Sequence, residues 1–138
     1  MTSKGRENTE LCCRGIRGAT TVPENTKEAI IAATKKLLQN IVTVNEVEIS
    51  DITCILFTTT SDLNAAFPAA AARELGWKQV PLLCGHEMNV PGSLSGCLRV
   101  LVLFNTNKRN EEIVHVYLGG AVTLRDEGER IWQDDGKK

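Results

Sequence analysis

The sequence predicts a single α/β (α+β) domain in which a β-sheet of about five strands is covered by one long helix and one short helix. The chain of 138 residues is long enough for one domain with a hydrophobic core and too short for two ordinary ones. Five segments read as strands bounded by turn signals, and only two segments have apolar residues at helical spacing. We expect the domain at residues 11–125, between a disordered extension at 1–10 and a flexible tail at 126–138.

The first strand is expected over residues 11–21, which are rich in small side chains. Side chains alternate between the two faces of a strand, so Gly15 and Ala19 share a face with Arg17. Because these neighbours are small, they leave space beside the guanidinium, which suits a bound ligand better than a packed core.

The long helix is expected to begin at Asn25, because Asn25 and Glu28 together have the spacing of a capping box. An apolar stripe from Ile30 to Ile41 then predicts a helix that covers one face of the sheet. Residues 43–51 are expected to form a loop.

The second strand, at residues 52–60, has strong β-propensity and ends in hydroxyl side chains. A short helix is expected at 66–75, with Pro68 in its first turn and Gly76 just past its end. The remaining strands are expected at 79–84, 97–105 and 113–118, the last of them extended briefly by 121–125.

Composition excludes several classes of function. A net charge of -1 argues against a broad surface for nucleic acid or membrane, and no apolar run is long enough to cross a bilayer. The first residues lack the apolar core of a signal peptide, and the five cysteines have an odd count, which suits reduced thiols in a cytoplasmic protein. Cys84, His86 and Cys97 match no common zinc spacing, and no glycine loop of the phosphate-binding type is present, so we predict neither metal nor cofactor.

Arg99 is the residue that points to a binding site. It lies in an apolar run and shares a strand face with Cys97, Leu101 and Leu103, where its permanent charge needs an anion. That anion is either a carboxylate of the protein, for which Glu87 is the candidate, or a ligand. A single arginine on a strand is usually a solvated edge residue, but Arg17 and Arg125 are also on or beside strands.

Four segments carry a family resemblance: RGIRGATTV at 14–22, DLNAAFPAAAAREL at 62–75, VPLLCGHEMNVPGSLSGCLRV at 80–100 and HVYLGGAVTLR at 115–125. In order and spacing they resemble the monofunctional chorismate mutases of the Bacillus type. The resemblance implies a mixed sheet in a homotrimer with a barrel-like centre and active sites between neighbouring subunits. It also implies conversion of chorismate to prephenate, a step in phenylalanine and tyrosine biosynthesis, in the cytoplasm and without a cofactor.

The same resemblance assigns roles to individual residues. Arg17 and Tyr117 would hold the side-chain carboxylate of the substrate, and Arg99 would face the ether oxygen and a carboxylate. Glu87, with the region of Cys84, would receive the ring hydroxyl. The other substrate contacts would be Phe67, Ala69, Arg73 and Leu83 on the wall, and Leu124 and Arg125 at the mouth.

Two positions depart from the family pattern, since relatives often have Lys in place of Ala70 and Thr in place of Leu83. The first change removes a positive charge from the entrance, and the second removes a hydroxyl. Two other functions have comparable features: a non-catalytic trimer that binds a small carboxylate metabolite, and an imine deaminase on a similar trimeric scaffold. The motifs of the deaminases are not found in this sequence, and Glu87 with Arg99 at family spacing favours the mutase.

Overall fold

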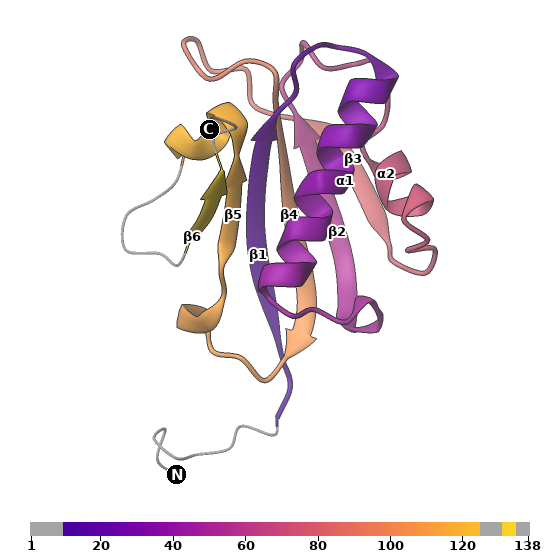
Figure 1. Ribbon diagram of the computed structural model, residues 1–138, viewed down its shortest axis with the longest axis vertical. Coiled ribbons are helices and arrows are strands. Elements are labelled where there is room, and N and C mark those ends of the chain that lie inside the picture. The colour runs from indigo at the N-terminus through magenta and orange to yellow at the C-terminus, as the bar shows by residue number, and fades with distance from the viewer. Residues whose placement is uncertain (1–9, 125–130, 135–138) are drawn as a thin grey trace.

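The computed structural model describes residues 10–124 and 131–134, and it shows a mixed six-stranded sheet with its helices on one side (Figure 1). The predicted α/β class, with one long and one short α-helix, is confirmed. The strand order across the sheet is β3-β2-β4-β1-β5-β6. The elements in chain order are β1 (Cys12–Thr21), α1 (Lys27–Val44), β2 (Ile52–Thr59), α2 (Ala69–Glu74), β3 (Leu82–His86), β4 (Cys97–Thr106), β5 (His115–Leu118) and β6 (Ile131–Asp134).

The two longest strands, β1 and β4, form the centre of the sheet and determine its layout. They run antiparallel and pair over their whole length, and β2 pairs with β4 on the other side in the same sense. The outer strands are added in parallel, β3 to β2, β5 to β1 and β6 to β5. Parallel strands cannot be joined by a tight hairpin, so each of these pairs brings together strands that are separated by a longer stretch of sequence.

Helix α1 packs closely on one face of the sheet (Figure 1). Its apolar stripe, which includes Leu37 and Ile41, belongs to the main core together with Ile16 of β1 and residues of β2 and β4. Gly18 permits this close approach, because a Cβ there would lie 2.6 Å from Ile41 Cδ1 and 3.2 Å from Leu37 Cδ1. Within residues 10–124 and 131–134, no helix is long and apolar enough to cross a membrane.

The opposite face is covered at one end by a segment that follows β5. There the 3-10 turn Gly119–Leu124 buries a small second cluster of Ala19, Cys97, Tyr117 and Ala121. Farther along this face Leu56, Leu101 and Leu103 are only half-buried in the single chain. Alternation along β4 therefore separates a fully buried face from one that keeps apolar side chains accessible, as the sequence pattern predicts.

The start of α1 differs from the expectation. Thr26, not Asn25, is the N-cap, and its hydroxyl accepts a hydrogen bond of 3.1 Å from the N–H of Ala29. The Asn25 side chain is used elsewhere, since its Oδ1 accepts from the N–H groups of Asn64 and Ala65. A tertiary contact with the loop after β2 thus overrides the local capping pattern.

The ends of several other elements also differ from the expected positions. Helix α1 continues to Val44, and a 3-10 turn occupies Ile49–Asp51, so the expected loop at 43–51 is partly helical. Helix α2 is limited to Ala69–Glu74 with Pro68 at the N-cap. Strand β3 covers Leu82–His86 instead of 79–84, because its pairing with β2 fixes its register.

The C-terminal part of the chain shows the largest departure. Gly119 has a φ of +56°, which ends β5, and residues 119–124 form a 3-10 turn where a strand extension was expected. Within the expected tail, Ile131–Asp134 forms the sixth strand, which pairs with all four residues of β5. Trp132 is paired with Val116 and packs against the main core, which gives this short edge strand its hydrophobic contact.

Candidate active site

Arg99 and Glu87 lie together at one end of the central strands. The register of the sheet places Arg99 between Ala19 of β1 and Thr58 of β2. Its side chain is 48% exposed, and its Nε lies 3.4 Å from Oε2 of Glu87. Glu87 immediately follows β3, and its backbone N–H donates to the carbonyl of Thr59 over 2.8 Å. The protein therefore supplies one carboxylate to Arg99, one of the two possibilities that the sequence left open.

The Thr58 hydroxyl fixes the carboxylate of Glu87. Its Oγ1 donates to the same Oε2 that faces Arg99, so that oxygen accepts from a neutral donor while it pairs with a cation. The sequence shows a run of hydroxyls at the end of this strand, but nothing in the run distinguishes Thr58 from its neighbours. Only the pairing of β2 with β3 and β4 identifies it.

A pocket of about 410 Å³ opens beside this pair. Besides Arg99 and Glu87 it is lined by the loop between β3 and β4 and by the end of the 3-10 turn, including Leu124. The pocket thus combines one cation, one anion and apolar wall, which suits a small polar molecule with negative groups and a hydrocarbon frame. Within the described residues, no group of three or more His, Cys, Asp or Glu side chains is placed to hold a metal ion.

Cys97 forms part of the pocket floor and stays in the thiol form. Burial raises the pKa of its thiol, and the nearby Arg99 guanidinium offsets only part of that rise. A buried thiol with a raised pKa is a poor nucleophile, because the thiolate is the reactive species. The pocket therefore lacks an activated nucleophile at this position.

Asp62 fixes the turn at Gly96, just before Cys97 of the pocket. Its Oδ1 accepts from the hydroxyl of Thr60, and its Oδ2 accepts from the N–H of Gly96 over 2.9 Å. These hydrogen bonds, the one from Thr60 first, lower the pKa of the carboxyl group. Gly96 has a φ of +59°, so the chain turns into β4 through a conformation that favours glycine. The link between Asp62 and this turn was not predicted.

Arg17 and Tyr117 lie on neighbouring strands, and their side chains share one face of the sheet. Pairing of β1 with β5 puts Ala19 beside Tyr117, and Arg17 is two residues before Ala19. Tyr117 is buried against Cys97, which links it to the floor of the pocket. The backbone N–H of Arg17 donates to Nδ1 of His115 over 3.0 Å, a contact that sequence reasoning missed.

The other predicted site residues lie in a second group. Phe67 and Cys84 line a separate pocket of about 400 Å³, where Phe67 is 74% exposed. In the adjoining elements Ala69 is buried, whereas Arg73 of α2 and Leu83 of β3 are exposed. Arg125 lies outside the described residues. Within a single chain, the predicted site residues therefore lie in two separate groups.

Comparison with known proteins identifies the family. A family model described as chorismate mutase type I matches residues 13–128. The chain belongs to the chorismate mutase type I family. As a member of this family it is an isomerase with chorismate mutase activity, as the resemblance implied.

Individual relatives agree with this assignment. The chain is 49% identical to chorismate mutase AroH of Thermus thermophilus over 113 residues, which are 81% of this chain and 93% of the relative. It is 46% identical to chorismate mutase AroH of Bacillus subtilis over 116 residues, 83% of this chain and 91% of the relative. A solved chorismate mutase from Clostridium thermocellum is 52% identical, with a TM-score of 0.79, and the match covers 80% of this chain and 98% of that one.

Proposed function

We propose that the chain converts chorismate to prephenate in the pocket beside Arg99, with Arg99, Glu87 and Arg17 as its catalytic residues. The observation that carries this proposal is the placement of Arg99 in the pocket, with its Nε 3.4 Å from Glu87. The reaction is an intramolecular pericyclic rearrangement, in which one bond breaks while another forms, without proton transfer or a covalent intermediate. It therefore needs neither a nucleophile nor a metal, only restriction of the substrate conformation and stabilisation of charge.

Arg99 supplies the charge stabilisation in this proposal. As the C–O bond of the substrate lengthens, negative charge grows on the ether oxygen, and a fixed guanidinium nearby lowers the barrier. The ion pair with Glu87 is made through Nε, and the two terminal nitrogens take the ether oxygen and a substrate carboxylate. Arginine suits this task better than lysine, because its planar fork binds both oxygen atoms at once.

Glu87 has two tasks in the proposal. It accepts the ring hydroxyl of the substrate, and it offsets the positive charge of a pocket that must hold a dianion. Its position supports both tasks. The Thr58 hydroxyl donates to the carboxylate, and the hydrogen bond from the Glu87 N–H to the Thr59 carbonyl fixes the backbone beside the pocket. Arg17 and Tyr117, from the neighbouring strands, hold the side-chain carboxylate of the substrate.

We further propose that the active site is completed between copies of the chain in a homotrimer. Two observations support this. The sheet face away from α1 keeps Leu56, Leu101 and Leu103 half-buried in the single chain, and Leu83, on the edge strand β3, is 64% exposed. The site residues also fall into two groups, which association would bring face to face. In the trimer, Phe67, Ala69, Arg73, Leu83 and Cys84 of one copy form the wall opposite the Arg99 pocket of the next.

The proposed location is the cytoplasm. All five cysteines are free thiols, two of them exposed at the start of β1. Such thiols persist most readily where the surroundings are reducing.

A direct assay tests the proposed reaction. Purified protein should remove the ultraviolet absorbance of chorismate, and the product should be identified as prephenate by its acid-catalysed conversion to phenylpyruvate. Binding of chorismate without its consumption would instead support the non-catalytic carboxylate-binding module. Sedimentation velocity tests the assembly: a species three times the mass of the chain is expected, and a monomer with full activity would contradict a site shared between copies.

A further inference from the structure

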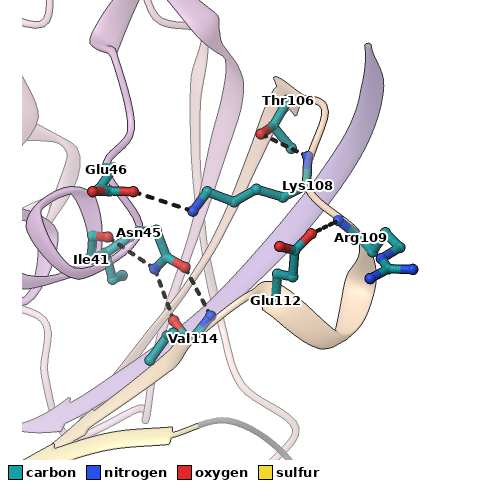
Figure 2. Close-up of polar contacts among 8 residues, drawn as sticks. All are labelled: Ile41, Asn45, Glu46, Thr106, Lys108, Arg109, Glu112 and Val114. Atoms are coloured by element: carbon teal, nitrogen blue, oxygen red, sulfur yellow. Dashed lines mark hydrogen bonds and ion pairs between the residues drawn. The ribbon is translucent and has the colours of Figure 1, made fainter. Parts of the chain in front are cut away.

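The start of β5 is fixed by a buried side chain at the end of α1. Asn45 is fully buried, and its Nδ2 donates to the carbonyls of Ile41 and Val114 over 3.0 and 2.8 Å (Figure 2). Its Oδ1 accepts from the N–H of Val114 over 2.8 Å. One amide therefore holds both backbone groups of Val114, and β5 starts at His115, two residues later than expected.

This arrangement changes the pairing opposite Arg17. In a regular parallel ladder the N–H of Arg17 would donate to a carbonyl of the neighbouring strand. The carbonyl of Val114 bonds to Asn45, and the N–H of Arg17 donates to the imidazole Nδ1 of His115 instead. Backbone pairing of β1 with β5 begins at the next residue, Gly18.

The hydrogen bond also defines the protonation of the imidazole. A backbone N–H only donates, so Nδ1 of His115 must carry a lone pair, and the proton of the neutral ring must lie on Nε2. In a doubly protonated ring, the N–H at Nδ1 would face the N–H of Arg17, and the two donors could not form a hydrogen bond. The half-buried His115 therefore acts at this point as an acceptor that takes the place of a main-chain carbonyl.

We propose that His115 is a positioning residue for Arg17. By binding the N–H of Arg17 it fixes the backbone from which the guanidinium extends, and so the direction in which this charge meets the substrate carboxylate. The same residue begins the strand that carries Tyr117, so one contact sets the relative position of two substrate-binding side chains. This inference rests on the proposed role of Arg17, and it adds a residue to which that proposal gives no part.

The test compares two substitutions at His115 in two backgrounds. His115→Ala removes the acceptor, and His115→Asn keeps an acceptor oxygen near the place of Nδ1. We expect His115→Ala to raise KM for chorismate about tenfold with a smaller change in kcat, because a displaced guanidinium weakens binding. His115→Asn should stay within about threefold of the unaltered protein. In an Arg17→Ala background, His115→Ala should change kcat/KM less than about twofold, because the residue acts through Arg17.

Several outcomes would overturn the inference. If His115→Ala lowers kcat/KM by the same factor in both backgrounds, the residue has a general structural role. If the single variant leaves KM unchanged, the residue has no role in positioning Arg17. If His115→Ala does not fold, nitrogen-15 NMR of the unaltered protein still decides, since a protonated Nδ1 at neutral pH would contradict the hydrogen bond. Failure of the proposed function is distinct from these results: there Arg17→Ala alone would leave KM unchanged.

Discussion

Replacement of Arg99 by alanine separates catalysis from stability. The side chain is 48% exposed and its ion pair with Glu87 spans 3.4 Å, so its loss should cost less than about 1 kcal/mol of unfolding free energy. Without the guanidinium, the activation free energy of the reaction should rise by about 3 kcal/mol, as when an enzyme loses one donor that stabilises charge in the transition state. That energy corresponds to a fall in kcat of roughly 10²-fold. The two effects are measured by chorismate consumption at saturating substrate and by chemical denaturation.

Matched variants make this prediction specific. Arg99→Lys keeps the charge but loses the planar fork, and it should lie between alanine and the unaltered protein. Arg109→Ala removes an exposed arginine that pairs with Glu111 outside the pocket, and it should leave kcat unchanged. If Arg99→Ala retains kcat within a few-fold while it remains folded, the role assigned to Arg99 is wrong.

Three further changes test other parts of the structure. Cys84→Ser should reduce kcat/KM only modestly, because the role proposed for Cys84 is contact with the substrate and not nucleophilic attack; a loss as large as that of Arg99→Ala would refute this. Gly18→Ala should destabilise the fold by about 1–3 kcal/mol in denaturation, because its Cβ would lie 2.6 Å from Ile41, and an unchanged midpoint would contradict that packing. Burial raises the pKa of the Cys97 thiol in the folded protein, whereas the thiol of the unfolded chain ionises above about pH 8.5. Ionisation then favours the unfolded state, so the free energy of unfolding should fall as the pH rises through this range. Cys97→Ala should lose less stability over that range, and a parallel decline would contradict the burial of this thiol.

The sequence predicted features that depend on neighbours along the chain. Alternation along 97–105 correctly separated the face of Arg99 from the buried face, and the spacing of apolar residues located α1. The separated motifs identified the family before any contact was known. These signals work because a strand or helix repeats its environment at a short, fixed period.

The tertiary structure decided what depends on segments far apart in the chain. Asn25 lost its capping role to a loop about forty residues away, and the N–H of Arg17 found its acceptor on His115, 98 residues away. The pairing of Glu87 with Arg99 depends on the register of three strands. Local pattern cannot specify such contacts, because each is set by the packing of elements that the sequence places independently. The sequence therefore determined the kind of protein, and the fold determined which polar atoms meet in its pocket.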